Sequence, residues 1–254
     1  MFDDQEASEL IGRWTARGAG HVDTVAPRMV FETMTVKGGA FRGVVLEQFA
    51  SIGGRFEGCL FESMNIRVAE VALRLFPSVY VDCSFDHSCI GSLGGGLARF
   101  ERCSFRDVSI GGWLGQTMDV IDCVFSGMLR HGRFFGRPES LWEEAYGKQA
   151  NEFLGNDFSE CTLVDVTFSG GVDLAAQVLP IGDSYAYMAD GRNSLERVSR
   201  AIQGWPEDGR RAAQLVLDAL RGELQGGQEQ LFVGETMFAD PSIWPAFRDV
   251  LAGS

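Results

Sequence analysis

Apolar residues recur at every fifth position along much of the chain, a period that fits neither an α-helix nor a flat β-strand. Within residues 31–81, ten of the eleven positions in this series are apolar. The series slips by one residue, continues through 85–125, and resumes at 153–168 after an interruption. Its 24 positions hold 12 of the 19 phenylalanines. The period predicts short segments that each point a central residue into a shared core and then turn a corner.

Four such segments make a square turn of about twenty residues, within the range that indicates a solenoid. Successive turns should lie about 4.8 Å apart, the spacing of neighbouring β-strands. We therefore predict a mainly β, quadrilateral coil. Its core residues include Phe56, Phe61, Phe85, Phe100, Phe105, Phe125, Phe158, Leu163 and Phe168.

Two irregularities interrupt the period. Gly95 and Gly115 are twenty residues apart at inward-facing positions, and we expect Leu93, Leu97 and Trp113 to fill the core there instead. The 24-residue spacing between residues 61 and 85 indicates either a four-residue bulge or a one-residue deletion.

Five of the six cysteines lie two residues before a large apolar residue. Metal sites built from cysteine need closely spaced pairs, and the chain has none with that spacing. Reduced cysteine packs as a small apolar residue, and no local histidine or basic cluster would lower these thiol pKa values. We expect the cysteines to face inward near the corners, with those at 103 and 123 one above the other. These corner residues are Cys59, Cys83, Cys103, Cys123 and Cys161.

The composition is that of a folded protein, with 45% hydrophobic and 22% charged residues in 254. The N-terminal sequence lacks the basic start and apolar stretch of a secretory signal. No apolar run reaches the roughly 18 residues of a membrane span. We expect a cytoplasmic protein with reduced thiols and no membrane partner.

Three regions are predicted. Residues 26–182 form the coil with a protruding loop at about 128–150, and residues 1–25 form an N-terminal cap. Residues 183–254 change to helical signals, such as Asn193 followed by Glu196, and Asp240 before Pro241. Because a β-helix ends in an unpaired edge that must be covered, the helical unit is expected to cap the coil or to mediate dimerisation.

The repeats, for example "ERCSFRDVSI" and "NEFLGNDFSECTLVDVTFSG", resemble the pentapeptide-repeat family over roughly residues 26–180. This resemblance implies a right-handed quadrilateral β-helix. Arg74, Met64, Met118 and Trp113 depart from the family pattern by placing large residues where it prefers small ones. Characterised members mostly bind and protect type II DNA topoisomerases, some of them as acidic rods that resemble DNA.

The interruption between residues 125 and 153 holds a basic and aromatic cluster, which we consider a candidate partner-binding loop because long loops on rigid scaffolds often carry function. Its residues are Arg130, His131, Arg133, Phe134, Phe135 and Arg137. In the alternative interpretation, the phenylalanines pack on the coil and the arginines pair with Glu139, Glu143 and Glu144.

The net charge of −13 is unevenly distributed. Residues 31–127 hold eleven acids and eight bases, whereas a DNA mimic needs about one negative charge per 1.7 Å of duplex axis. Only the last coil is strongly acidic, and its acids are either a second candidate partner surface or an ordinary solvated face. They are Glu152, Asp157, Glu160, Asp165 and Asp173.

An enzyme is not expected, and neither is a cofactor or a metal. Only Asp86, His87 and Cys89 bring catalytic residue types together, and on a coil the first two would point outward. Two non-enzymatic functions remain. The protein either protects or regulates DNA gyrase or another type II topoisomerase by direct binding, giving resistance to inhibitors, or it is an interaction, immunity or regulatory protein with a different protein partner. Direct nucleic-acid binding is not expected, and a homodimer is compatible with either function.

Overall fold

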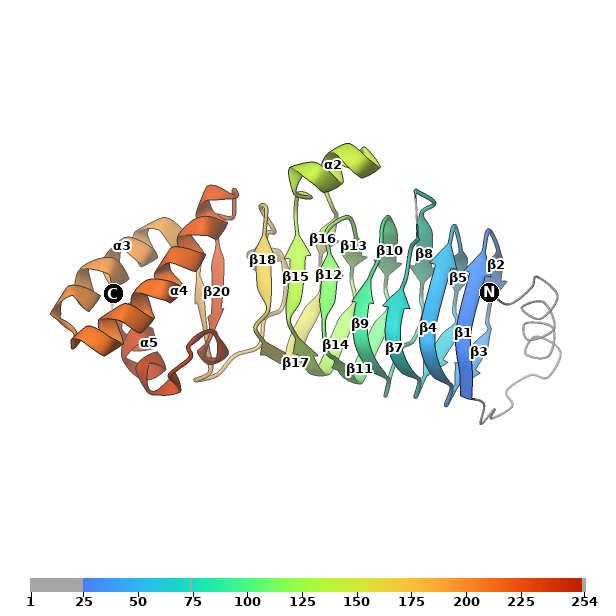
Figure 1. Cartoon of the computed structure of the whole chain (residues 1–254), viewed down its shortest axis with the longest axis horizontal. Helices are drawn as coiled ribbons and strands as arrows, with labels where there is room; N and C mark the ends of the chain where they lie inside the picture. Colours follow the sequence, from blue (N-terminus) through green and yellow to red (C-terminus); the bar gives the residue numbers. More distant parts are fainter. Residues whose placement is uncertain (1–24, 74, 253–254) are drawn as a thin grey trace.

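The computed structural model describes residues 25–73 and 75–252, and it shows a rod (Figure 1). A parallel β-solenoid of about five turns makes up most of its length, and a small, mainly helical unit follows at the C-terminal end. The predicted N-terminal cap lies outside the described residues except for Val25, which begins the first strand.

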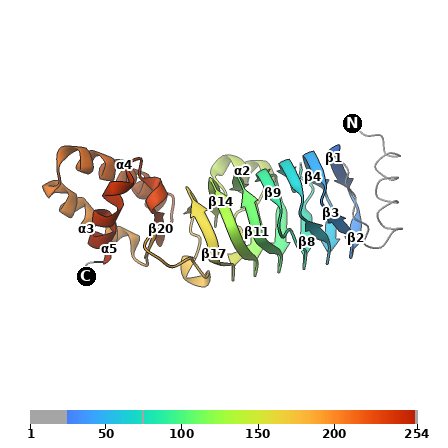
Figure 2. The same cartoon turned by 90° about the horizontal axis from the view of Figure 1, so that it is seen from below.

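Parallel strands of successive turns pair into ladders along the rod (Figures 1 and 2). The longest ladder contains β1 (Val25–Glu32), β4 (Val45–Ile52), β7 (Asn65–Glu70), β9 (Cys89–Gly94), β11 (Ser104–Ile110), β14 (Val124–Arg130) and β17 (Asp157–Val164). The second contains β2 (Thr35–Lys37), β5 (Arg55–Glu57), β8 (Ser78–Val81), β10 (Ala98–Glu101), β13 (Asp119–Ile121) and β16 (Phe153–Leu154). Shorter ladders join β3 (Ala40–Arg42) to β6 (Leu60–Glu62), and β12 (Trp113–Gly115) through β15 (Gly132–Phe135) to β18 (Thr167–Ser169).

The inward-facing residues form columns along the rod, as the five-residue period predicts. Phe41 pairs with Phe61, twenty residues later, and their rings stack. The stack continues through six rings, with successive centroids 4.4–5.1 Å apart. It consists of Phe41, Phe61, Phe85, Phe105, Phe125 and Phe158. All nine predicted core residues are buried.

The corners use a left-handed backbone two residues after the inward-facing residue. Gly58, two residues after Phe56, has φ 59°. Such values cost most residues conformational strain and glycine very little, which accounts for part of the high glycine content. In the following turns the same corner holds Asp82, Arg102 and Asp122, with φ of 52–53°.

Four cysteines lie along one corner of successive turns. The thiols of Cys59, Cys83 and Cys103 each donate a hydrogen bond to a carbonyl one turn earlier, at 3.4–3.5 Å. Cys123 follows in the next turn, and Cys161 is buried in a different ladder, opposite Gly127. All five are buried, and four lie along one corner as predicted, whereas Cys161 lies within strand β17 (Asp157–Val164) rather than at a corner.

The extra four residues form a bulge between β7 and β8. Phe56 pairs with Tyr80, 24 residues later, which excludes the one-residue deletion. The five-residue count assigns Phe76 and Val81 to the core, and this is wrong: Phe76 is 54% exposed, and Tyr80 is fully buried beside a half-buried Val81. The Tyr80 hydroxyl donates a hydrogen bond to the carbonyl of Val71 at 2.9 Å, so a buried backbone acceptor next to the bulge is satisfied.

Trp113 fills the space that the glycines leave empty. Gly115 pairs with a phenylalanine of the next turn but adds no side chain. The Trp113 ring lies 5.3 Å from that of Phe105 and is almost fully buried. Leu93 is buried as expected, whereas Leu97 is only half-buried.

The C-terminal unit has a hydrophobic core of its own. Its helices are α3 (Gly191–Ala201), α4 (Glu207–Gln225) and α5 (Trp244–Ala252), and it also contains an antiparallel pair of strands, β19 (Tyr185–Met188) and β20 (Leu231–Gly234). The sequence predicted helices only. The core consists of Met188, Leu195, Val198, Ile202, Ala213, Val216, Leu217, Leu220, Leu231, Val233, Phe238, Trp244 and Phe247.

The N-cap of helix α3 lies three residues before Asn193, the predicted start. Asp190 is its N-cap, and the carboxylate accepts a hydrogen bond from the backbone N–H of Asn193 at 3.0 Å. The second start signal is confirmed, because Asp240 caps a 3-10 turn that leads into α5.

Side chains of the C-terminal unit cover the open end of the solenoid. Phe232 of β20 joins the solenoid core. The Gln228 amide accepts a hydrogen bond from the N–H of Val172 and donates one to its carbonyl, both at 2.8 Å. The Tyr185 hydroxyl accepts from the N–H of Leu163 at 3.0 Å. The unit thus hides the hydrophobic edge that an ending β-helix exposes.

Candidate protein-docking site

A lateral arm, residues 136–152, leaves the solenoid between β15 and β16 and carries helix α2 (Ser140–Tyr146) (Figure 1). The predicted loop began too early, because residues 128–130 and 132–135 belong to β14 and β15. Phe134 and Phe135 are only 1% and 3% exposed. They are core residues, which removes them from the candidate binding surface.

Helix α2 has no buried residue. Leu141 is 77% exposed, and the rings of Trp142 and Tyr146 stack on each other at 5.7 Å. Gly147, in a left-handed conformation, ends the helix. A helix of this length is not stable in water by itself, so contacts at its two ends must hold it in place.

A buried glutamine and an asparagine hold the two ends of the arm together. The Gln116 side chain accepts a hydrogen bond from the N–H of Glu139 at 3.0 Å. The Asn151 amide donates to the carbonyls of Gln116 and Phe135, both at 2.8 Å. The two chain segments that support α2 are thereby fixed to the solenoid.

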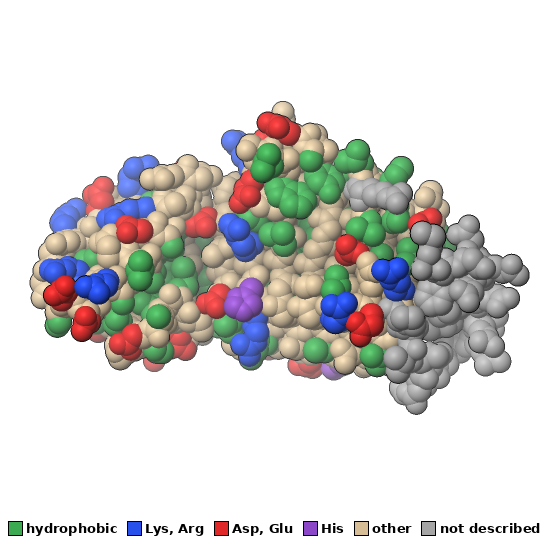
Figure 3. Space-filling model, in the orientation of Figure 1, with side chains coloured by type: hydrophobic (Ala, Val, Ile, Leu, Met, Phe, Trp, Pro, Cys, Tyr) green, Lys and Arg blue, Asp and Glu red, His purple; other side chains and the backbone are tan. Residues whose placement is uncertain are grey.

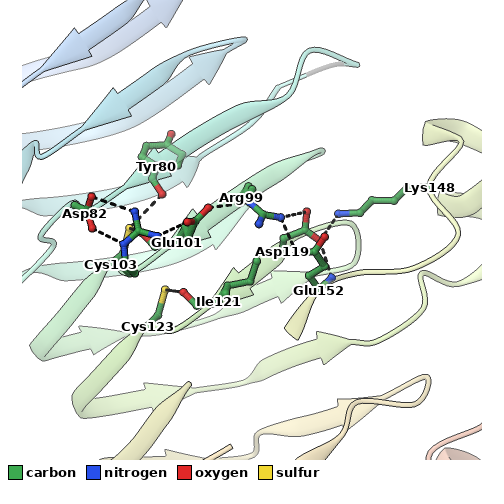
Figure 4. Close-up of polar contacts among 11 residues, drawn as sticks. Tyr80, Asp82, Arg99, Glu101, Cys103, Asp119, Ile121, Cys123, Lys148 and Glu152 are labelled. Atoms are coloured by element: carbon green, nitrogen blue, oxygen red, sulfur yellow. Dashed lines mark hydrogen bonds and ion pairs between the residues drawn. The ribbon is translucent and has the colours of Figure 1, made fainter. Parts of the chain in front are cut away.

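An ionic network adds a second anchor (Figure 4). Lys148 Nζ lies 2.7 Å from Asp119 Oδ1 in β13 and donates to the carbonyl of Thr117 at 3.2 Å. Arg99 reaches Asp119 at 3.6 Å and Glu152, at the end of the arm, at 3.0 Å.

The network continues along the same side of the rod (Figure 4). Arg99 pairs with Glu101 at 3.3 Å, Glu101 pairs with Arg102, and Arg102 donates two hydrogen bonds to Asp82 at 2.8 and 3.2 Å. The hydrogen bond from Arg102 holds the pKa of Glu101 below its usual value. The sequence interpretation missed these residues, although opposite charges twenty positions apart, such as Asp82 and Arg102, are a visible signal.

The predicted basic residues lie next to the arm without forming one cluster. His131 Nδ1 is 3.6 Å from Asp165. Arg133 pairs with Glu139 at 3.7 Å, as the alternative interpretation expected. Arg130 and Arg137 are exposed, and neither has an ion-pair partner among the described residues.

The predicted acids of the last coil are distributed over different sides of the rod. Glu152 is in the Arg99 network, and Asp165 is beside His131. Asp157 accepts a hydrogen bond from Ser159 N at 2.9 Å, and Asp173 caps a 3-10 turn (Leu174–Ala176). Glu160 is exposed in β17. These acids therefore do not form a continuous acidic face.

Hydrophobic side chains gather on the upper part of the rod, below α2 and toward β8 (Figure 3). The bulge between β7 and β8 contributes Leu75 and Phe76, which are 62% and 54% exposed. Leu114 of β12 is 40% exposed. Leu75 and Phe76 are neighbours in the chain, and exposed apolar side chains that occur together are typical of interaction surfaces.

Within the described part of the chain, no group of three His, Cys, Asp or Glu residues has a geometry that could hold a metal ion. None of the helices in that part is long and apolar enough to cross a membrane. No protein-family model matches the chain, and no curated protein matches it either. The architecture, a parallel β-solenoid with a lateral arm and a C-terminal helical unit, defines the structural class.

Proposed function

We propose that the protein is a non-enzymatic scaffold of the pentapeptide-repeat type that binds a protein partner through its lateral arm. The repeat assignment is supported by the large buried residues that recur every fifth position, such as Phe56 and Phe61, and by the left-handed corners two residues after them.

The exposed helix α2 carries the proposal. It presents Leu141 to solvent, where this side chain gains nothing from burial in this chain, and the half-buried rings of Trp142 and Tyr146 stack beside it. At the same time, the Gln116, Asn151 and Lys148 contacts hold it in a fixed position. A rigid support under exposed apolar residues is what a preorganised binding element requires, because less conformational entropy is lost when it binds.

Ion pairs along the rod favour this interpretation over DNA mimicry. Glu57 lies 2.7 Å from Lys37 and 2.6 Å from Arg55, and Arg42 pairs with Glu62 at 2.8 Å. Carboxylates that are neutralised locally do not present the regular negative charge of a phosphate backbone.

A type II topoisomerase is the first partner to test, since a protruding element on a rod is the feature that the family resemblance connects with that activity. We would measure supercoiling by purified DNA gyrase, with and without a quinolone, in the presence of the wild-type protein or of Leu141→Glu. Leu215→Glu, which changes a 70% exposed leucine on α4, is the matched control.

Protection or inhibition by the wild type and the control, but not by Leu141→Glu, would support a topoisomerase as the partner. If none of the three proteins affects gyrase, that partner is excluded. The alternative, an interaction, immunity or regulatory protein with another protein partner, then takes its place and can be tested with the same variants.

A further inference from the structure

A groove of about 430 Å³ lies between α3 and α4 of the C-terminal unit. Basic side chains, all of them arginines, are visible over these helices in Figure 3, interspersed with acids. The groove itself is lined by three arginines, Arg192, Arg200 and Arg221, and by a single acid, Glu196. Its lining therefore favours an anionic ligand.

Arg221 is held across the groove in a fixed orientation. One terminal nitrogen donates to Asp218 Oδ1 on its own helix at 2.8 Å, and the other donates to Ser199 Oγ on α3 at 3.0 Å. Leu224, which is half-buried, supplies an apolar side chain beside it, whereas Leu195 lies beneath the groove in the core of the unit. The groove thus combines a positioned guanidinium with an apolar surface.

Arg192 has no evident role in stability. It is the second residue of α3 and exposed, and it has no ion-pair or hydrogen-bond partner among the described residues. A cation at a helix N-terminus is unfavourable, because the helix dipole places positive charge there. Among the described residues, Arg192 makes no contact that would offset this unfavourable interaction with the helix dipole.

Arg200 is also available for a ligand. Its pairing with Glu196 at 3.4 Å involves side chains that are 80% and 59% exposed, and such pairs contribute little and exchange readily. Guanidinium groups bind carboxylates through paired, charge-assisted hydrogen bonds. We propose that this groove binds an acidic segment of a protein partner, with carboxylates on the arginines and an apolar side chain against Leu224.

The Leu224 side chain favours a peptide segment over an isolated anion, because its exposed part would stay uncovered beneath a small inorganic ion. This inference does not depend on the arm. Groove variants and arm variants change different surfaces, so each proposal can fail while the other stands.

The test uses the full-length protein and a short fluorescent peptide that alternates glutamate and leucine, with binding followed by fluorescence anisotropy. The same peptide with glutamine in place of glutamate is the ligand control. Arg192→Gln is the test variant, since it removes no internal contact. Arg211→Gln is its match, because Arg211 pairs with Glu207 on α4 outside the groove lining.

We expect saturable binding of the glutamate peptide that weakens with salt. Arg192→Gln should weaken it roughly tenfold, the scale of one charge-assisted hydrogen bond, whereas Arg211→Gln should stay within about twofold of the wild type. Melting temperatures of both variants equal to that of the wild type would show that the fold is intact.

Three results would overturn the inference: no saturable binding, equal binding of the glutamine peptide, or equal effects of the two variants. Anionic lipid vesicles provide a further control. If vesicles bind through Arg192 while the glutamate peptide does not bind, the groove recognises a lipid surface and the peptide proposal is wrong.

Discussion

Lys148 Nζ lies 2.7 Å from Asp119 Oδ1, and this pair connects the lateral arm to strand β13 of the solenoid. The two side chains are only 18% and 16% exposed, so solvent screens their attraction less than that of a surface pair. Lys148 also donates to a backbone carbonyl, that of Thr117. A short helix without a buried residue thereby obtains a defined position on a rigid support.

Replacing Lys148 by methionine should loosen the arm without unfolding the solenoid. We expect amide hydrogen exchange in α2 to accelerate by roughly five- to tenfold, because a partly buried pair of this kind contributes about 1 kcal/mol to local stability. Arg67→Met is the control, since the Arg67–Glu47 pair is exposed on the rod. If exchange in α2 is equal in both variants, the ion pair does not position the arm.

Tyr80→Phe should destabilise the protein by about 1–3 kcal/mol, because the carbonyl of Val71 would remain buried without its hydrogen bond. Tyr146→Phe removes a hydroxyl from the exposed arm and should change stability by less than about 0.5 kcal/mol. Urea denaturation of both variants measures the difference. Equal midpoints would mean that the tyrosine does not stabilise the bulge.

Thiol labelling should separate one cysteine from the other five. Cys89 is exposed, whereas the remaining five are buried. The hydrogen bond with the Cys103 thiol and burial raise the pKa of Cys83 to about 12, and burial raises the pKa of Cys161 to about 12. Near pH 8 these groups therefore stay protonated and unreactive.

A chromogenic disulfide reagent should thus titrate one fast thiol in the native protein and all six in denaturant. The variant Cys89→Ser should abolish the fast phase. Additional fast thiols in the native protein would contradict the packing of the cysteine corner.

Gln228→Ala should weaken the junction between the solenoid and the C-terminal unit. Gln228 is 1% exposed, and its amide satisfies backbone groups of Gly171 and Val172. Leaving buried backbone groups unpaired costs about 1–3 kcal/mol each. Gln214→Ala, which removes a surface contact on α4, is the matched control and should have little effect on the melting temperature. Equal melting temperatures would show that Gln228 does not seal the solenoid end.

The solenoid could be predicted from the sequence because a five-residue period, broken only by one slip and one interruption, brings the phenylalanines of the stack to inward-facing positions. The position of the phase slip could not, since the period is equally compatible with Phe76 or Tyr80 facing inward. Only the three-dimensional structure shows that Tyr80 is the inward-facing residue, because there its hydroxyl reaches the Val71 carbonyl across the bulge. Similarly, β19 and β20 pair through residues such as Tyr187 and Phe232, which are far apart in sequence and carry no local signal.

The candidate site was predicted only in part. An interrupted period correctly indicated a protrusion, but it could not show that Phe134 continues the core column into the next turn. The basic residues were predicted to form a binding site because they lie close together in the sequence. The contacts that fix the arm involve Gln116 and Asp119, which precede the arm by one turn and become neighbours only when the chain coils.

Affinity capture with purified, immobilised protein tests the central claim, that the arm binds a protein partner, most directly. Wild type, Leu141→Glu and Leu215→Glu would be compared in extracts of cells that express the chain, and the retained protein would then be purified and its binding measured by titration. The account predicts that one purified partner binds the wild type and Leu215→Glu equally and binds Leu141→Glu at least tenfold more weakly, the loss expected when a central apolar contact becomes charged. Equal affinity for all three proteins would contradict it.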